Sequence, residues 1–269
     1  MFTQVRPAAP IAPWLGGKKH LNGIIIEKIE SVAHEAYIEP FVGMGGMLLR
    51  RGRRPKLEVM NDRNGEIVNL FRILQRHYPQ FLDVMRFQLQ SRREFNRLRD
   101  VDPATLTDLE RAARFLYLQR LGFAGKVNSV FGVSATSASR FSLSRLEPIL
   151  EAAHERLEAV VFENLDWAEI MRRYDHKGAM FYLDPPYVGG ENDYGKGMFD
   201  RDQFALMGDV LRRLSGRFVL SINDTPEVRE WFAGFEIEPV RLNYSVSSSG
   251  STEAREVIIS NFRPQTLLL

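Results

Sequence analysis

The 269-residue sequence predicts an α/β fold with a doubly wound, mostly parallel sheet and a small, mainly helical insertion. Three observations support this prediction. Short apolar runs alternate with segments of helical apolar spacing in the first and last parts of the chain. Between about residues 79 and 145 no segment has a convincing strand pattern. Glycines and prolines stand at the ends of several apolar runs, as is typical of turns.

The first part, residues 1–78, alternates between helices and strands. A helix is predicted around residues 18–30, followed by a strand ending at Ile38, a glycine-rich turn at "GMGG" and a short helix through Leu49. The next strand, "LEVM", leads to Asp62, and "NGEIVNLFRIL" then has the apolar spacing of a helix.

Residues 79–145 are predicted to form a separate small module within the α/β order. Thr107 and Glu110 form a capping box for a helix over "LERAARFLYLQRL", and Gly122 ends it. The following stretch, "FAGKVNSVFGVSATSASRFS", is rich in Gly and Ser and predicts a loop or a weak hairpin.

The alternation resumes in residues 146–269. Strands are predicted at "EAVVFEN", "AMFYL" and "RFVLSIN", with two final strands in "FEIEPVRLNYSV" and "EVIISNF". Three helix starts are predicted from their caps: Asp166 with Glu169, Asp200 with Gln203, and Thr225 with Pro226. Six or seven strands with intervening helices predict a doubly wound sheet closed by a hairpin.

The composition excludes several classes of protein. Apolar content of 44% and charged content of 26% are typical of a soluble globular protein, and no run approaches ~18 uninterrupted apolar residues. With no signal-peptide layout at the start, a cytoplasmic protein is expected, without a membrane partner. The absence of cysteine excludes disulfides, thiolate zinc sites and a cysteine nucleophile. Five scattered histidines lack ligand spacing, so no metal is expected.

Positive charge is concentrated in the predicted insertion. Residues 86–145 hold eleven Lys or Arg against five acids, a net +6, and since the whole chain carries +2, the remainder carries −4. This asymmetry is typical of a surface that binds a polyanion such as nucleic acid. Solvated basic helices would give the same count, so both interpretations stay open.

The stretch "MFYLDPPYVGG" combines a predicted central strand with an acid and an aromatic ring. Consecutive prolines end the strand because they lack the amide hydrogen that a sheet needs. Ligands in open α/β sheets bind beyond the carboxyl ends of the strands, where Asp184 and Tyr187 are expected to lie. A strand-ending turn with an Asx-type hydrogen bond explains an isolated D-P-P-Y equally well.

The turn "EPFVGMGG", residues 39–46, is predicted where the first strand meets its helix, and Asp62 comes 23 residues after Glu39. Glycines let a ligand approach the backbone, and an acid at this spacing can accept both hydroxyl hydrogens of a ribose. Leu48 occupies the third glycine position of G-x-G-x-x-G, which favours a nucleoside without phosphates. The alternative is a tight turn with no ligand.

Upstream, "PWLGGKKHL" contains Trp14 and Lys18 and lacks the spacing of a Walker phosphate loop. A flexible Gly-Gly before the lysine can place its ammonium group against a carboxylate. Trp14 alone is explained equally by the core or by a stacking surface.

In this order the motifs resemble those of Dam-type (D12-class) DNA adenine-N6 methyltransferases, which depend on S-adenosylmethionine. The resemblance covers nearly the whole chain and is weakest at about residues 80–145. It rests on "PWLGGKKHL", "EPFVGMGGML", "NDRNGEIVNLFRIL", "FENLDWAEI", "FYLDPPYVGGENDYGKGMF", "FVLSINDT" and "EVIISNF".

The resemblance implies a Rossmann-like methyltransferase sheet with an inserted target-recognition domain. Residues 1–78 would form the cofactor-binding part, residues 79–145 the insertion, and residues 146–269 the catalytic part of the same α/β domain. The implied reaction transfers a methyl group from S-adenosylmethionine to N6 of an adenine flipped out of double-stranded DNA. A monomer is expected. The recognition sequence and any restriction partner stay open.

The resemblance also implies roles for individual residues. The implied catalytic residues are Asp184, Pro185, Pro186 and Tyr187. The implied cofactor-binding residues are Trp14, Lys18, Glu39, Pro40, Phe41, Gly43, Gly45, Asp62, Asp166 and Asp184. In this set Lys18 meets the methionyl carboxylate, Asp62 meets the ribose, and Asp166 or Trp167 lies near the adenine ring.

DNA binding is expected in the basic module and after the D-P-P-Y motif. The expected residues are Arg114, Arg120, Lys126, Asn128, Arg140 and Tyr194. Because "QRLGFAGKVNSVFG" resembles the base-reading hairpin of the family only loosely, a GATC target cannot be assumed.

The implied chemistry explains the D-P-P-Y motif. If the Asp184 carboxylate and the Pro185 carbonyl each accept one hydrogen of the amine, its nitrogen becomes tetrahedral and its lone pair is freed for attack. Tyr187 supplies a face on which the base stacks. Two alternatives are methylation of cytosine N4 and a non-catalytic DNA-binding module that retains a nucleoside site.

Overall fold

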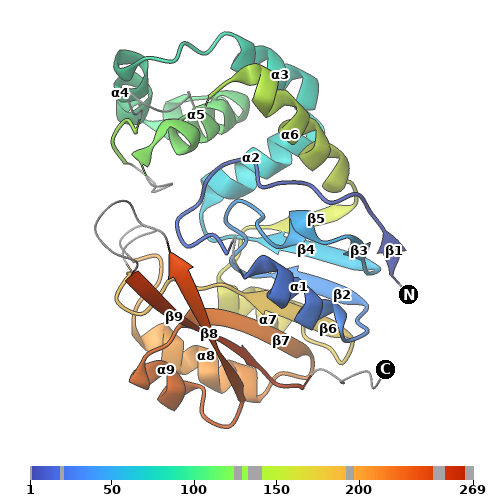
Figure 1. The fold of residues 1–269 in the computed structure, drawn as a ribbon. Coiled ribbons are helices and arrows are strands. Elements are labelled where there is room, and N and C mark those ends of the chain that lie inside the picture. The colour runs from blue at the N-terminus through green and yellow to red at the C-terminus, as the bar shows by residue number, and fades with distance from the viewer. Residues whose placement is uncertain are drawn as a thin grey trace.

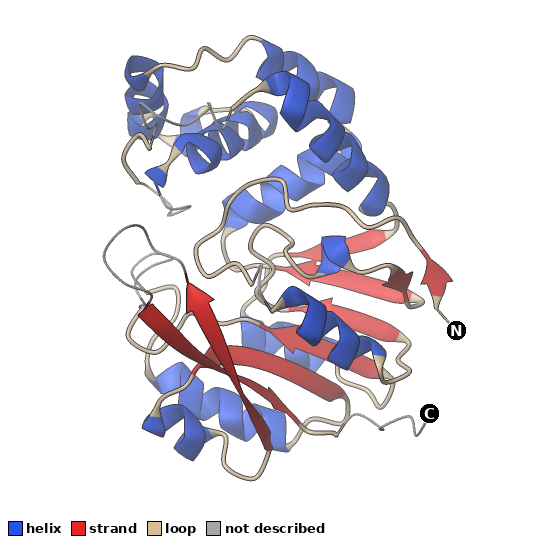
Figure 2. Ribbon diagram, viewed as in Figure 1, coloured by secondary structure: helices blue, strands red, loops and turns tan. Residues whose placement is uncertain are grey.

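The computed structural model places most of the chain in one sheet with helices on both faces and a helical unit beside one end of it (Figure 1, Figure 2). The residues that it describes are 2–18, 21–123, 129–132, 141–191, 197–244 and 252–263. No helix in these ranges is long and apolar enough to span a membrane.

The sheet has seven strands and confirms the predicted topology. Its order is β5 (Val160–Glu163), β4 (Leu57–Asn61), β2 (Ala36–Glu39), β6 (Ala179–Leu183), β7 (Arg217–Asn223), β9 (Thr252–Ser260), β8 (Glu236–Tyr244). The first five of these run parallel, and β9 pairs antiparallel with both β7 and β8. The sheet is therefore doubly wound and closed by a hairpin.

The strand order reverses at the centre of the sheet. From β2 the order runs through β4 to β5 on one side and through β6 to β7 on the other. Ile38 of β2 pairs with Val59 of β4 and with Phe181 of β6, so the carboxyl ends of these strands meet at one edge. Ligands of doubly wound sheets bind beyond such a switch point. The segments after β2, β4 and β6 are thereby brought around one site.

Alternate strand residues enter two cores because successive side chains point to opposite faces. Tyr182 and Val219 belong to one core, whereas Phe181 and Leu183 belong to the other. The first core contains residues of α1 (Asn22–Glu30) and α2 (Gly65–Arg76), and the second contains residues of α7 (Trp167–Tyr174), α8 (Asp202–Arg212) and α9 (Pro226–Trp231). The central strands β2, β6 and β7 are thus buried on both faces.

In the described residues, the middle of the chain is helical, as predicted. Its elements are α3 (Tyr78–Arg86), α4 (Arg92–Asp100), η2 (Pro103–Thr105), α5 (Asp108–Leu121) and α6 (Leu143–Arg156). The capping box of Thr107 and Glu110 is present at α5, and Gly122 is its C-cap. Phe81 and Leu116 belong to the same hydrophobic cluster as Tyr182 of the sheet. The helical unit therefore continues the core on one face of the sheet.

Shorter elements complete the described ranges. β1 (Thr3–Gln4) pairs antiparallel with β3 (Arg53–Arg54), and the short helix predicted through Leu49 is the 3₁₀ turn η1 (Leu48–Arg50).

Two of the three predicted caps are present. The Asp166 side chain accepts from Ala168 N at α7, and Thr225 Oγ1 accepts from Val228 N at α9. The prediction for Asp200 is wrong: α8 begins at Asp202, its N-cap is Arg201, and no side chain caps it. Only the main-chain carbonyl of Asp200 accepts there, from Gln203 N.

The first helix also starts later than predicted, at Asn22. The residues before it form a turn in which Gly16 has a φ of 72° and the Lys18 ammonium donates to the Gly16 carbonyl. The turn ends at a lysine whose side chain enters the site described next.

Candidate active site

A cavity of about 530 Å³ lies where the chain leaves β2, β4 and β6. Its walls come from the N-terminal segment, the glycine-rich turn, the start of α2, α5 and the segment after β6. The predicted site residues among its lining are Trp14, Lys18, Glu39, Pro40, Phe41, Gly43, Asp62, Asp184 and Pro186, and Arg120 lines it too. The cavity has the size of a small-molecule site.

The glycine-rich turn packs directly against Trp14. Gly43 has a φ of 49°, in the left-handed region that favours glycine. A Cβ atom at Gly43 would lie 2.6 Å from Trp14 Nε1, which leaves no room for a side chain. Gly45, with a φ of 72°, is not among the lining residues, and a Cβ there would meet Leu49 instead. Gly43 and Trp14 thus form one wall, which Gly45 supports from behind.

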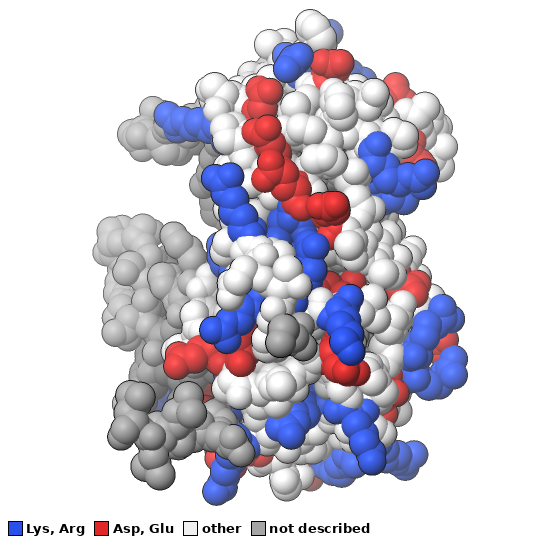
Figure 3. All heavy atoms as spheres, turned by 90° about the vertical axis from the view of Figure 1, so that its right-hand side faces the viewer, with Lys and Arg blue, Asp and Glu red and all other residues white. Residues whose placement is uncertain are grey.

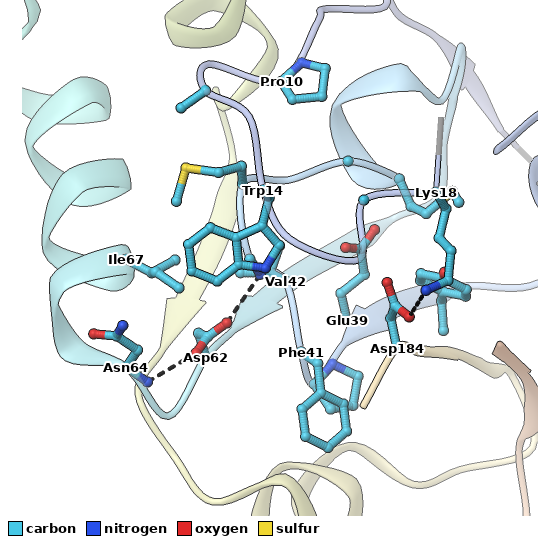
Figure 4. Close-up of a pocket in the computed structure, with 18 of the residues that line it drawn as sticks. Pro10, Trp14, Lys18, Glu39, Phe41, Val42, Asp62, Asn64, Ile67 and Asp184 are labelled. Carbon is cyan, nitrogen blue, oxygen red and sulfur yellow. Dashed lines mark hydrogen bonds and ion pairs between the residues drawn. The ribbon is translucent and has the colours of Figure 1, made fainter. Parts of the chain in front are cut away.

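Asp62 joins that turn to the loop after β4. Its Oδ2 accepts from Gly43 N at 3.0 Å and its Oδ1 accepts from Asn64 N at 2.9 Å (Figure 4). The carboxyl group is half-buried, and desolvation raises its pKa to about 6 although the two N–H groups oppose the shift. Each oxygen keeps a second acceptor position, because a carboxylate offers about four in all.

Glu39 supplies a second carboxyl group, whose protonation state at neutral pH differs from that of Asp62. It is buried at the end of β2, and Tyr37 Oη donates to its Oε1 at 2.7 Å. Desolvation raises the Glu39 pKa to about 8, and the bond from Tyr37 only partly offsets this. At neutral pH Glu39 is therefore mainly protonated, while Asp62 is mainly ionised.

The Asp184 carboxylate is paired with a buried lysine. Lys18 Nζ lies 2.7 Å from Asp184 Oδ1 (Figure 4). It also donates to Tyr187 Oη and to the Gly16 carbonyl, each at 3.0 Å. The same ammonium lies 4.5 Å from the centre of the Tyr187 ring. Burial raises the Asp184 pKa, and Lys18 opposes the rise by stabilising the charged form.

This ion pair brings together the lysine and the acid that the sequence placed 166 positions apart. All three ammonium hydrogens of Lys18 have acceptors. A ligand carboxylate at Lys18 would therefore share or replace one of these partners. Of the rest of the motif, Pro186 lines the cavity, Pro185 is buried, and Tyr187 is held at the side of Lys18.

Asp166 and Trp167 occupy different positions. Asp166 is not among the lining residues; its side chain is 46% exposed, caps α7 and lies 3.7 Å from the Arg63 guanidinium. Trp167 lines the cavity, and its Nε1 donates to Gln203 Oε1 at 2.7 Å. Of the two residues expected near an adenine ring, the structure brings Trp167 to the cavity.

Two of the three basic residues of α5, Arg114 and Arg120, donate to main-chain carbonyls. Arg114 is buried, and its guanidinium donates to the main-chain carbonyls of Leu98 and Arg99 at 2.6 and 3.0 Å. Arg120 donates to the Ile11 carbonyl at 2.7 Å. Both hold chain segments together, which is at odds with the expectation that they face DNA phosphates. Lys126, Asn128, Arg140 and Tyr194 lie outside the described residues.

Two groups at the site were not expected from the sequence. Ser221 Oγ donates to Asp184 Oδ1 at 3.2 Å, and Gln119 Nε2 donates to the Pro13 carbonyl at 2.8 Å, beside the wall that contains Trp14. The sequence contains one indication of Ser221, a hydroxyl group in the otherwise apolar run "FVLSI". No local feature of the sequence indicates the role of Gln119, because its partner lies 106 positions away.

The fold and the cavity define a Rossmann-like α/β protein with a nucleoside-sized site at its switch point. The sequence profile of the D12 class of N6 adenine-specific DNA methyltransferases matches residues 14–246. The chain therefore belongs to this family, which confirms the resemblance of its motifs. It is an adenine-specific DNA methyltransferase, and membership of the family implies S-adenosylmethionine as the methyl donor.

Curated relatives agree over most of the chain. It is 25% identical to the DNA adenine methylase of Escherichia coli (strain K12) over 274 residues, covering 93% of this chain and 94% of the relative. It is 29% identical to the DNA N-6-adenine-methyltransferase of Escherichia phage P1, covering 93% of this chain but only 35% of the phage protein. Among solved structures, precorrin 8W decarboxylase of Methanobacterium thermoautotrophicum has 11% identity and a TM-score of 0.44, covering 96% of this chain and 100% of that one.

Proposed function

We propose that this enzyme methylates N6 of an adenine flipped out of double-stranded DNA, and that Asp184 and Pro185 accept the hydrogens of the amine. The observation that carries this proposal is the position of the Asp184 carboxylate. It lies at the end of β6, on the wall of the cavity, with one oxygen held by Lys18 and with Tyr187 beside it.

The cavity fits S-adenosylmethionine. Asp62 is an ionised acceptor suited to ribose hydroxyl groups, and the absence of a side chain at Gly43 lets Trp14 pack against the turn and form the cavity wall. The cationic lining residues already have protein partners: Lys18 pairs with Asp184, Arg50 donates to the Gly46 carbonyl, Arg63 to the Met198 carbonyl, and Arg120 to the Ile11 carbonyl. Such a lining suits a nucleoside better than a pyrophosphate.

Within that frame Trp14, Lys18, Glu39, Phe41, Asp62 and Trp167 would hold the cofactor. When bound, S-adenosylmethionine supplies an electrophilic methyl group. Protonated Glu39 can donate one hydrogen bond and adds no negative charge to the site. Ionised Asp62 can accept two, and the N–H groups that it already binds fix its orientation.

The remaining chemistry belongs to the substrate amine, whose lone pair is delocalised into the adenine ring. The Asp184 carboxylate and the Pro185 carbonyl accept hydrogen bonds from its two N–H groups and draw these hydrogens out of the ring plane. The nitrogen becomes tetrahedral, and its lone pair becomes nucleophilic. Attack would form the N–CH3 bond as the S–CH3 bond of the donor breaks, and S-adenosylhomocysteine would leave. The nitrogen would then carry positive charge, which the Asp184 carboxylate stabilises. The proton that the nitrogen then loses passes to Asp184 or to water.

Base recognition is proposed for residues 120–140 of the helical unit, since the flipped base is the same in every site and discrimination needs contacts to neighbouring base edges. The outer side of α6 does not suit DNA. Glu147, Glu151 and Glu155 follow one another there at a spacing of four residues, and Figure 3 shows a stripe of acidic side chains over the helical unit on that face. We expect the duplex to avoid this stripe.

The proposal is tested by replacing Asp184. Asp184→Ala and Asp184→Asn should each lower methyl transfer from radiolabelled S-adenosylmethionine into DNA by at least about 1,000-fold. DNA affinity, measured by fluorescence anisotropy, should stay within about threefold because the carboxylate acts on the amine and not on phosphates. Asp209→Ala, which removes an exposed acid of α8, is the control. Retained turnover in either Asp184 variant would disprove the proposed mechanism.

A further inference from the structure

Two buried hydroxyl groups stand behind the Asp184 carboxylate, and the proposed chemistry assigns neither a role. Ser221 on β7 is fully buried, and Tyr182 on β6 is 2% exposed. Tyr182 Oη lies 2.8 Å from Ser221 Oγ, which lies 3.2 Å from Asp184 Oδ1. The parallel register accounts for this arrangement. Leu183 pairs with Leu220, so the next residues, Asp184 and Ser221, lie side by side.

The hydrogen bonds of this chain have a definite direction. An ionised carboxylate can only accept, and a serine hydroxyl has one hydrogen to donate. Ser221 therefore donates to Asp184, and Tyr182 must donate to Ser221. Two residues of the sheet interior thus form a relay of hydroxyl groups that ends on one oxygen of the catalytic acid.

The relay makes the two oxygens of Asp184 different. Oδ1 receives hydrogen bonds from Ser221 and from Lys18, which come from separate parts of the fold. Among the residues that the structure describes, none donates to Oδ2. In Figure 4 the second carboxylate oxygen of Asp184 points away from Lys18, on the side of Glu39. One oxygen is anchored and the other remains an acceptor.

We propose that Ser221, oriented by Tyr182, is a positioning residue that anchors Asp184 Oδ1 so that Oδ2 accepts a hydrogen of the adenine amine. The inference rests on the proposed function, since the amine is the group that Oδ2 would meet. A carboxylate held by one donor can turn about its Cβ–Cγ bond, because this torsion is broad. A second donor from another direction selects one orientation, and a preoriented acceptor needs no reorganisation during the reaction.

Three variants test this role. Ser221→Ala removes the donor and should lower kcat about 10- to 100-fold, the effect of losing one hydrogen bond to a charged group. Ser221→Thr keeps a hydroxyl group and should retain at least about a third of wild-type kcat. Tyr182→Phe leaves Ser221 able to donate but unoriented, and should cost about 3- to 10-fold.

Two readouts separate positioning from loss of structure. KM for DNA, and Kd for S-adenosylmethionine measured by calorimetry, should stay within about threefold in both Ser221 variants, because Ser221 is not among the residues that line the cavity. Tyr182 does line it, but Tyr182→Phe keeps the ring and removes only the hydroxyl group that is bonded to Ser221, so the same limit is expected there. Tyr182→Phe should have no further effect on kcat in a Ser221→Ala background, because Tyr182 acts through Ser221. Melting temperatures identify a variant that fails to fold. If Ser221→Ala is such a variant, the kcat values of Ser221→Thr and Tyr182→Phe are compared instead.

The pH profile gives a third readout. Several groups interact with the Asp184 carboxylate: Lys18 of the N-terminal segment, Glu39 of β2, Tyr182 of β6, Ser221 of β7 and Glu256 of β9. The bond from Ser221 lowers the Asp184 pKa, so its loss raises that pKa. The acid limb of kcat should therefore move to higher pH in Ser221→Ala and stay in place in Ser221→Thr.

The outcomes distinguish this inference from the proposed function. If wild-type enzyme methylates adenine and Ser221→Ala has wild-type kcat and pH profile, the positioning role is wrong and the function stands. The role is equally wrong if the effects of Tyr182→Phe and Ser221→Ala multiply. If wild-type enzyme methylates no adenine, the proposed function itself fails.

Discussion

Asp62 allows a quantitative test of cofactor binding, because the loss of affinity on its replacement can be estimated from its hydrogen bonds. Asp62→Ala removes the acceptor of Gly43 N and Asn64 N and the proposed acceptor of the ribose hydroxyl groups. Hydrogen bonds to a charged group contribute ~1.5–3 kcal/mol, and water that enters the open cavity recovers part of this. We expect affinity for S-adenosylmethionine to fall by ~1–3 kcal/mol, which raises Kd about 5- to 150-fold.

The assay is calorimetric titration at pH 8, where Asp62 is ionised. Asp175→Ala is a matched control, because the Asp175 carboxylate also accepts two main-chain hydrogens, from Ser215 N and Gly216 N, but lies outside the cavity. Both variants should melt at lower temperature, whereas only Asp62→Ala should lose affinity. Equal Kd values for wild type and Asp62→Ala would remove Asp62 from the site, and an equal loss in Asp175→Ala would assign the effect to instability.

Four further predictions concern the same site. Affinity for S-adenosylmethionine should fall about tenfold per pH unit below about 6, where Asp62 becomes protonated; calorimetry across pH 5–8 measures this, and a flat profile would exclude Asp62. The pKa of Asp62 is higher in the folded than in the unfolded chain, so its contribution to the free energy of unfolding should fall as the pH rises from ~4 to ~6. Asp62→Asn should remove this pH dependence. Gly43→Ala forces a left-handed alanine against Trp14 and should raise Kd at least about tenfold, whereas Gly23→Ala in α1, with no atom within 4 Å of the new Cβ, should not; equal Kd values would refute the contact. Tyr187→Phe should retain more turnover than Tyr187→Ala in steady-state assays, since the ring face stacks the base, and equal losses would assign the role to the hydroxyl that Lys18 binds.

Local signals predicted the elements that position the site. The apolar run before Asp184 ends at two prolines, and neither a sheet nor a helix can continue through them, so the acid had to stand at a strand end. Glu39 and Asp62 each follow a run of strand residues, and the parallel register brings both to the same edge. These placements depend on periodicity and backbone chemistry, which short stretches of sequence contain.

The contacts that complete the site could not be predicted this way because their partners are distant in the chain. Nothing local pairs Lys18 with Asp184, or Ser221 with the same carboxylate. Arg114 shows the same limit: a basic residue on a predicted helix suggested a phosphate contact, and nothing local indicates that its guanidinium donates to two carbonyls at the end of α4. Charge counts locate basic segments and do not reveal which cations are already used inside the fold.

The identity of the modified base is the most direct test of adenine methylation by this enzyme. Purified enzyme is incubated with methyl-labelled S-adenosylmethionine and unmethylated DNA, the DNA is digested to nucleosides, and the label is followed by chromatography with mass detection. We expect label in N6-methyladenine for wild type and none for Asp184→Ala. Label in N4-methylcytosine, or no labelled nucleoside from a folded enzyme that binds both substrates, would contradict this expectation.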